Sequence, residues 1–549
     1  MGQFQGDIVR REFVLLVCAI VAIYVGGYFF LPDIYHAAHT TIGVIGGILI
    51  GIGLYDLLQT RHAILRNFPV LGHFRYLLER IRPEIQQYFI EGNTDGRPFS
   101  REERSLVYQR AKGELDTVPF GTQQDVYQVG YQWVKHSIVA KHVDMATMRV
   151  VIGGEDCKQP YSASILNISA MSYGSLSGRA IESLNGGAKD GNFAHNTGEG
   201  SISRYHLKHG GDLIWQIGTG YFGCRNPDGT FNPEMFKTNA HRPEVKMIEL
   251  KISQGAKPGH GGILPAGKIT KEIAEIRGVP MGQDVISPPS HSEFNTPIGL
   301  LEFIKRLRDL SGGKPVGFKL CIGKRREFIS LCKAMVQTGI YPDYISVDGG
   351  EGGTGAAPLE FSNHIGSPGL ESLIFVHNCL TGFGIRKKMK VMSSGKIASS
   401  FDMMKRLAVG ADACYAARSM MLALGCIQAL RCNSNHCPAG VATNNPHLEA
   451  GLVVSHKRGR VANFHRETLR HFAEMLGAMG VTHPDHLRPW NLMVRTGPNE
   501  IKNFAQIFDF VDDGDFLKGK LPADYLWPYE MASAESFENL KKVSPVPFS

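Results

Sequence analysis

From about residue 160 onward, short apolar runs alternate with amphipathic helical stretches, and this alternation constrains the fold more than any other feature. It is typical of βα units, in which each parallel strand is followed by a helix that covers the sheet. Eight such strands predict an α/β fold, a (β/α)8 TIM barrel with its chemistry at the carboxyl ends of the strands. The predicted strands are residues 165–170, 193–196, 247–252, 284–287, 316–321, 344–348, 390–394 and 413–417. Helices are predicted at 270–277, 296–310, 325–338 and 399–409.

Two apolar runs lie within the first sixty residues. Phe13–Leu31 has nineteen residues without a charge; as a helix it would be about 28 Å long, close to the hydrocarbon thickness of a bilayer. Ile42–Tyr55 is a second run, which needs Ala37–Leu58 to span. Arginines flank the pair and none lies between the runs, so the positive-inside rule places both ends and the catalytic part in the cytoplasm. We expect a transmembrane helical hairpin in the inner (cytoplasmic) membrane; a cleaved signal peptide or a buried helical cap are the alternatives.

Four regions are expected along the chain. They are a membrane anchor at 1–60, a helical linker or cap at 61–150, the barrel at 151–480 and an irregular extension at 481–549. Apolar residues among arginines predict helix in 61–92, and Ser100 with Glu103 predicts a capping box for a helix that ends near Lys112.

Three of the ten cysteines stand in a C-x5-C-x4-C-P run, namely Cys426, Cys432 and Cys437. The ten show no regular disulfide framework, which indicates a reducing compartment. Thiolates at short loop spacing, the last followed by proline, suit an iron–sulfur cluster better than zinc. Three ligands rather than four point to a cluster with three irons. A set of buried apolar cysteines is the alternative.

Charge and glycine-rich loops narrow the function class. A formal net charge of +8 is modest for 549 residues, and no dense basic cluster with interleaved aromatics predicts a nucleic-acid partner. The loop Asp348–Pro358 lets backbone N–H groups approach a ligand, but it lacks the Gly-Lys-Ser/Thr of a nucleoside triphosphate site. The seventh and eighth strands end near Gly395 and Arg418, where barrels commonly hold a phosphate.

Five stretches resemble the flavin domain of the glutamate synthases in order and spacing: SAMSYGSLS (169–177), NTGEG (196–200), QGAKPGHGGILP (254–265), DGGEGGTGAAP (348–358) and GC…C…CPAGVATN (425–444). The resemblance covers roughly residues 150–470. It implies FMN at the barrel mouth and a 3Fe-4S cluster on the three cysteines. The implied flavin residues are Ala170, Met171, Ser172, Gln254, Lys319, Gly349, Gly350, Gly353, Gly355, Ser394, Gly395, Ala417 and Arg418.

Lys319 suits this role because a cation beside N1/O2 stabilises the anionic reduced flavin; a lysine that snorkels from a barrel strand is the alternative. The resemblance also implies a 2-oxoglutarate site made of Glu199, Lys251, Lys257 and Arg277. Cations suit a dicarboxylate, and Lys257 is expected to protonate or orient the imino group. Lys257 and Glu199 are the catalytic candidates, and a solvated helix-end residue is the alternative for Arg277.

Two features depart from the family. No glutaminase domain fits before residue 150, so we expect free ammonia, another amine or a partner subunit to supply nitrogen. Ile263 stands where the family usually has a glutamine, and His260 replaces an acidic residue. The loss of a polar contact of this kind costs about 1–3 kcal/mol, which bears on the identity of the substrate.

The sequence therefore predicts a glutamate synthase-type oxidoreductase acting on CH–NH2 donors. It would reduce the imine of 2-oxoglutarate with ammonia, or another amine, to glutamate or an N-alkylglutamate. No dinucleotide fingerprint occurs, so ferredoxin or a reductase subunit is the expected electron donor. One alternative is a membrane-tethered flavin and iron–sulfur electron-transfer subunit without amino-acid synthesis; a binding-only role is another.

Overall fold

The computed structural model describes residues 2–30, 32 and 35–538, and its contacts divide the chain into two compact units, Met1–Gly96 and Arg97–Ser549. Leu31 and residues 539–549, which belong to the predicted anchor and extension, lie outside the described residues. The finer predicted boundaries at 60, 150 and 480 stay predictions.

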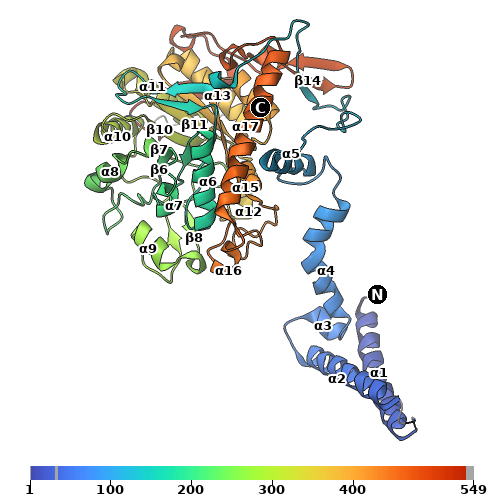
Figure 1. Ribbon diagram of the computed structural model, residues 1–549. Coiled ribbons are helices and arrows are strands. Elements are labelled where there is room, and N and C mark those ends of the chain that lie inside the picture. The colour runs from blue at the N-terminus through green and yellow to red at the C-terminus, as the bar shows by residue number, and fades with distance from the viewer. Residues whose placement is uncertain (1, 31, 33–34, 539–549) are drawn as a thin grey trace, which may run out of the picture. The chain divides into compact units, whose positions relative to one another are not determined.

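The N-terminal unit is helical (Figure 1). Its helices are α1 (Gly2–Phe30), α2 (His36–Leu58), α3 (Ala63–Asn67) and α4 (Gly72–Ile85), and a π-helical turn follows at Gln86–Ile90. By length and composition, Arg11–Phe30 and Ala37–Leu58 could each cross a membrane, and 0% and 11% of these stretches are buried. They coincide with the two predicted spans, but length and composition alone do not establish a membrane anchor.

A buried carboxylate fastens the end of α2 to α4. Asp56 is fully buried and accepts hydrogen bonds from the backbone N–H of Val70 (2.9 Å) and from His73 Nε2 (3.0 Å). A buried carboxylate is tolerated only with such partners, so this contact fixes the turn between the two helices.

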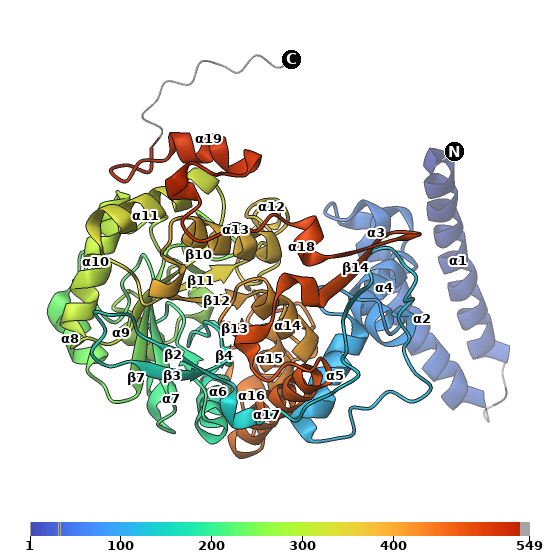
Figure 2. The same cartoon turned by 90° about the horizontal axis from the view of Figure 1, so that it is seen from above.

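Eight parallel strands close into a barrel in the second unit, which confirms the predicted (β/α)8 fold (Figure 2). The barrel strands are β4 (Leu166–Ile168), β5 (His195–Asn196), β6 (Leu213–Ile217), β7 (Val245–Lys251), β10 (Val316–Cys321), β11 (Tyr344–Asp348), β12 (Lys390–Ser394) and β13 (Ala413–Ala416). The helices that follow them are α6 (Gly178–Gly191), α7 (Arg204–Leu207), α8 (Pro233–Ala240), α10 (Pro297–Leu310), α11 (Arg325–Thr338), α13 (Gly369–Gly382), α14 (Ser400–Ala408) and α15 (Arg418–Leu424). The predicted helix at 270–277 is α9 (Lys271–Arg277), and α12 (Leu359–His364), α16 (Pro446–Glu449) and α17 (Val454–Ala478) complete this part.

The predicted barrel strand at 284–287 is wrong. Residues Val285–Ile286 form β9, which pairs antiparallel with β8 (Ile263–Leu264) outside the barrel. The third barrel strand is instead β6, which the sequence analysis did not find. Every residue of β6 is buried, as expected for a parallel strand covered on both faces, whereas Ile286 is 68% exposed.

Segments before and after the barrel also have regular structure. Ser100 and Glu103 form the predicted capping box at the start of α5 (Arg101–Lys112), which contacts α17. Residues 481–538, which were expected to be irregular, contain two strands and two helices. These are β14 (Leu492–Gly497), β15 (Glu500–Asn503), α18 (Phe504–Ile507) and α19 (Ala523–Met531); β14 pairs with β15 and with β1 (Gln132–Val134). An antiparallel pair, β2 (Arg149–Ile152) and β3 (Tyr161–Ser164), precedes the barrel.

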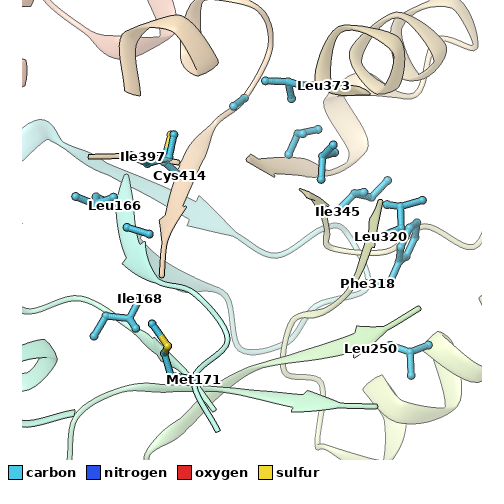
Figure 3. Close-up of a cluster of buried hydrophobic side chains, with 14 of the residues drawn as sticks. Leu166, Ile168, Met171, Leu250, Phe318, Leu320, Ile345, Leu373, Ile397 and Cys414 are labelled. Atoms are coloured by element: carbon cyan, nitrogen blue, oxygen red, sulfur yellow. The ribbon is translucent and has the colours of Figure 1, made fainter. Parts of the chain in front are cut away.

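Side chains alternate between two environments along the strands. Phe318 and Leu320 of β10 belong to the large core shared with the helices, and Figure 3 shows them beside Ile345 of the neighbouring strand β11. Lys319, between them, lines a cavity at the mouth of the barrel. A second buried cluster, which includes Met247 and Met392, forms an apolar layer of the barrel. Farther along β7 come the buried polar side chain of Glu249 and then Lys251, which lines the mouth of the barrel. The alternation therefore builds the site from every second strand residue.

Candidate active site

A buried carboxylate lies in the polar layer of the barrel. Glu249 of β7 is fully buried and accepts three hydrogen bonds, from Asn196 Nδ2 (2.8 Å), Gln216 Nε2 (2.7 Å) and Ser346 Oγ (2.6 Å). Three donors from three strands satisfy the charge of this carboxylate. These hydrogen bonds hold the Glu249 side chain in a fixed position inside the barrel.

Lys319 and Asp348 form a buried ion pair, with Nζ 3.3 Å from Oδ2. Asp348 also accepts hydrogen bonds from Ser394 Oγ (2.6 Å) and from the backbone N–H of Gly255 (3.1 Å). Burial opposes the charged forms, but the opposite charges outweigh it: they lower the pKa of Asp348 and raise the pKa of Lys319, to which Glu249 also contributes. Both groups are therefore charged at neutral pH.

Two adjoining cavities lie at the carboxyl ends of the strands. The smaller, of about 70 Å³, is lined by the predicted flavin residues Ala170, Gln254, Lys319, Gly353, Ser394, Gly395, Ala417 and Arg418. The larger, of about 680 Å³, is lined by the predicted residues Ala170, Met171, Ser172, Glu199, Lys251, Gln254, Lys257, Gly350, Gly353, Gly355, Ala417, Arg418 and Cys432. We call them together the mouth cavity. The structure thus brings twelve of the thirteen predicted flavin residues to its wall.

Gly349, the remaining predicted residue, does not line the mouth cavity but packs against Gly255, which lies next to the lining residue Gln254. A Cβ on Gly255 would lie 1.6 Å from the carbonyl oxygen of Gly349, so the loops after β7 and β11 meet through bare backbone. Position 255 therefore requires glycine.

One end of the mouth cavity carries two cations. Arg418 donates from Nη2 to the carbonyl of Glu351 (2.5 Å), and its guanidinium lies 5.2 Å from the centre of the Phe99 ring. Lys396, which the sequence analysis did not assign, lines both cavities. Burial and the charge of Arg418 lower the pKa of Lys396. Two cations beside Gly395 suit a phosphate group.

Four predicted substrate and catalytic residues come together around one carboxylate. Glu199 Oε1 lies 2.9 Å from Lys251 Nζ. Burial would raise the pKa of Glu199, but Lys251, Lys257 and Arg277 outweigh it and lower that pKa. Burial lowers the pKa of Lys257 to about 8, against the attraction of Glu199 and with the repulsion of Lys251. Three cations share one carboxylate, and the site has an excess of positive charge.

Arg277 supports this cluster from outside the mouth cavity, which it does not line. Its side chain is only 5% exposed, donates from Nη2 to the carbonyl of Tyr173 (3.1 Å) and lies 5.2 Å from the centre of the Phe222 ring. Burial lowers the pKa of Arg277 to about 10, and Glu199 raises it. Arg277 therefore acts on Glu199 through its charge, and its burial excludes a solvated helix end.

The three cysteines of the C-x5-C-x4-C run lie in the segment after α15 as free thiols, with Cys437 buried and the other two half-buried. Within the described residues, no three His, Cys, Asp or Glu side chains converge on a single metal ion. A cluster distributes its ligands over several irons and has no such requirement. Burial raises the pKa of the Cys426 thiol to about 12; the Gln428 N–H (3.4 Å from Sγ) lowers it, and the two neighbouring thiols raise it. Three interacting, partly buried thiols are a soft donor set that fits an iron–sulfur cluster.

Several functional residues escaped the sequence analysis. Asp348, Glu249 and Lys396 are described above, and Glu351 is a fourth. Glu351 pairs with Arg406 (Oε1 to Nη2, 2.8 Å) and accepts from the backbone N–H of Gly369 (2.8 Å), which fixes the glycine-rich loop after β11. For Asp348 and Glu351 the available signal was an acidic residue at or shortly after the end of β11, on the edge of the barrel where ligands bind.

The fold and this site define a (β/α)8-barrel enzyme with an anion-binding mouth. Residues 128–482 match the model of a family described as the conserved region in glutamate synthase, and the chain belongs to this family of oxidoreductases. The glutamate synthase large subunit-like protein YerD of Bacillus subtilis is 37% identical over 512 residues, which cover 84% of this chain and 97% of that protein.

Other similarities are more partial. An archaeal glutamate synthase [NADPH] of Archaeoglobus fulgidus is 34% identical over 321 residues, which cover 58% of this chain and 60% of that protein. A solved structure of a mutant flavocytochrome b2 with pyruvate bound reaches a TM-score of 0.40 at 14% identity, covering 85% of this chain and 94% of that one. This last likeness is too low to carry an inference.

Proposed function

We propose that this chain reduces the imine formed from 2-oxoglutarate and ammonia to glutamate, with FMN in the mouth cavity and a 3Fe-4S cluster at the three cysteines. One observation carries the proposal. Three cations converge on Glu199 next to a cavity lined by the predicted flavin residues. A simple electron-transfer subunit has no use for a dicarboxylate site, so this arrangement does not favour the alternative.

The residues present fit FMN at two points. Lys319 and its partner Asp348 offer a fixed cation at one side of the mouth cavity, and Lys396 with Arg418 offers a phosphate site. When bound, FMN would supply hydride transfer. The protein's part is to hold the ring, to keep Lys319 charged and to bind the substrate beside it.

The cysteines Cys426, Cys432 and Cys437 would hold the cluster, which supplies single-electron transfer. The chain has no dinucleotide-binding fingerprint, so we infer that ferredoxin or a reductase subunit delivers electrons.

The chain's own residues bind the substrate and move protons. Lys251 and Lys257 line the mouth cavity, and their ammonium groups would bind the carboxylates of 2-oxoglutarate. Lys257, with its lowered pKa, exchanges a proton readily near neutral pH and can protonate the substrate. Glu199 stays ionised, and its carboxylate can therefore accept a hydrogen bond from the incoming ammonium and hold it beside the substrate.

A small cavity favours ammonia over larger amines. It has a volume of about 20 Å³ and is lined by Glu199, Lys257, His260 and Gly262 among others. A water molecule needs roughly 10–15 Å³ of such space, so the cavity has room for one ammonia, and a larger amine would need its walls to move. We expect turnover with ammonia to exceed turnover with methylamine by at least about tenfold. Equal rates at saturating amine would contradict this assignment and favour an N-alkylglutamate as product.

Binding of 2-oxoglutarate should weaken at alkaline pH. The dicarboxylate prefers protonated Lys257, whose pKa is about 8 in the free protein. Affinity should be steady below about pH 7 and fall above pH 8, by up to about tenfold per pH unit. Titration calorimetry between pH 6.5 and 9.5 measures this. The variant Lys257→Gln should bind more weakly and lose the pH dependence; a flat profile in the unmodified protein would exclude Lys257 as a ligand.

The proposal as a whole is tested by spectra. Purified under anaerobic conditions, the protein should show a flavin spectrum and an iron–sulfur signal. After chemical reduction, 2-oxoglutarate plus ammonia should reoxidise the flavin, and neither compound alone should do so. If the protein contains both cofactors but 2-oxoglutarate plus ammonia does not reoxidise the flavin, the chain would be an electron-transfer subunit.

We also infer that α1 and α2 anchor the protein in the inner membrane with the barrel in the cytoplasm. The two spans of suitable length and the flanking arginines support this. The full chain should remain in membranes after carbonate washing. Protease should reach the barrel in inverted vesicles and not in intact spheroplasts. Release of the intact chain by carbonate would argue against the anchor.

A further inference from the structure

The loop that carries the cysteines is tied to two other loops by one lysine. Lys268 lies in a short 3-10 turn, Ala266–Lys268, which follows β8. Its ammonium donates to the backbone carbonyls of Cys432 (2.7 Å), Ala442 (3.2 Å) and Ser175 (3.3 Å). Ser175 follows the predicted flavin residue Ser172 by three positions. One side chain thus joins the cysteine loop to the loop beside the flavin site.

Backbone and amide contacts reinforce the same connection. Asn444 Nδ2 donates to the carbonyls of Gly174 (2.9 Å) and Lys268 (2.9 Å). Asn435 Nδ2 donates to the carbonyl of Gly267 (3.2 Å), and the N–H of Ser177 donates to the carbonyl of Val441 (2.9 Å). We call residues 174–177, 266–268 and 432–444 the junction. It is a built contact between three segments and not a chance approach of one side chain.

The charge of Lys268 lacks a carboxylate partner. Its side chain is only 5% exposed, and the ion pairs found among residues 2–30, 32 and 35–538 do not include it. Carbonyl oxygens satisfy its hydrogen bonds but do not neutralise a buried ammonium, which is unfavourable unless an opposite charge lies near. Its Nζ contacts the carbonyl of Cys432 (2.7 Å), so its charge lies beside the cysteine ligands. Burial lowers the pKa of Lys268, and the sulfurs of Cys432 and Cys437 act in the opposite direction. A negative charge at those sulfurs would complete the site.

We propose that Lys268 is the positioning residue and the counter-cation of the cluster site: its three carbonyl contacts hold the cysteine loop in place, and its charge balances that of the thiolates and their iron–sulfur core. This inference rests on the cluster of the proposed function. Net charge and hydrogen bonding set the potential of such clusters, so Lys268 raises the cluster's reduction potential and fixes its loop beside the flavin loop.

Three variants of the full-length protein separate these two roles. Lys268→Met removes both contacts and charge, Lys268→Arg keeps the charge, and Asn444→Ala removes contacts without a change in charge. Lys271→Met is the matched control, because the Lys271 side chain is 84% exposed. Hydrogen–deuterium exchange of residues 432–444 reports the clamp, and an EPR-monitored redox titration reports the charge.

We expect exchange in residues 432–444 to accelerate by about tenfold or more in Lys268→Met, since each hydrogen bond to a charged group is worth at least a factor of that size. The cluster potential should become more negative in Lys268→Met, stay near the unmodified value in Asn444→Ala, and be largely restored in Lys268→Arg. Unchanged exchange and potential in a folded Lys268→Met protein would overturn the inference. If the unmodified protein holds no iron, the cluster of the proposed function fails and the counter-cation with it, while exchange still decides the clamp.

Discussion

Replacement of Lys319 by Met should destabilise the barrel by about 3–5 kcal/mol, because it leaves the buried carboxylate of Asp348 without its counter-ion. Asp348 would keep its hydrogen bonds from Ser394 Oγ and from the backbone N–H groups of Gly255 and Gly349, but it would lose the ammonium that balances its charge and that of Glu249. The loss of the cation should also lower the reduction potential of the flavin, since the anionic reduced form loses its partner. Thermal unfolding in detergent and a redox titration of the flavin measure the two effects.

A double variant separates stability from redox chemistry. Lys319→Met with Asp348→Asn removes both charges, and it should recover most of the lost stability. The potential of the proposed flavin should stay below that of the unmodified protein, because the double variant still lacks the Lys319 charge that would stabilise the reduced form. A single variant as stable as the unmodified protein would mean that Lys319 and Asp348 do not depend on each other.

The variant Glu199→Gln should bind 2-oxoglutarate as well as the unmodified protein or better, and yet lose activity. Removal of the carboxylate leaves Lys251, Lys257 and Arg277 with more uncompensated positive charge for the dicarboxylate. Turnover should fall by about 10²-fold, because the ammonium is no longer held in position beside the substrate. Calorimetry with 2-oxoglutarate measures the affinity, and steady-state rates at varied ammonia concentration measure the turnover.

Opposite changes in affinity and turnover distinguish Glu199 from a residue that only holds the fold. Glu275→Gln is a matched control, because Glu275 is an exposed carboxylate on α9 that pairs with Lys271. It should leave both quantities unchanged. A parallel loss of affinity and turnover in Glu199→Gln would mean that the carboxylate only orders the lysines.

The barrel could be predicted from the sequence because most of its strands are buried apolar runs followed by amphipathic helices. The failure at β6 has a physical cause. Its run LIWQI is as apolar as the others, but the helix after it, α8, begins sixteen residues later, beyond a glycine-rich loop. The apolar run around Val285 was chosen in its place. Ile286 is exposed, however, and a strand of a barrel that is covered by helices has no exposed apolar side chain of this kind.

The candidate site shows a similar limit. Motifs identified Lys319, but its partner follows from the strand register, which pairs Lys319 with Ser346 and Cys321 with Asp348. Glu249 was part of a predicted strand, but its partner Gln216 lies on β6, the strand that the sequence analysis missed, and the pairing of β6 with β7 sets these two residues side by side. Residues that act through long-range pairing carry no local pattern, so sequence reasoning finds the group that touches a ligand before the group that holds it.

The three cations around Glu199 have a practical consequence for work on the purified protein. Inorganic anions such as sulfate and phosphate resemble a carboxylate in charge and hydrogen bonding, and they should compete with 2-oxoglutarate for these cations. Apparent Michaelis constants will then depend on the buffer. Crystals grown from sulfate should show density for that anion near Lys251 and Lys257.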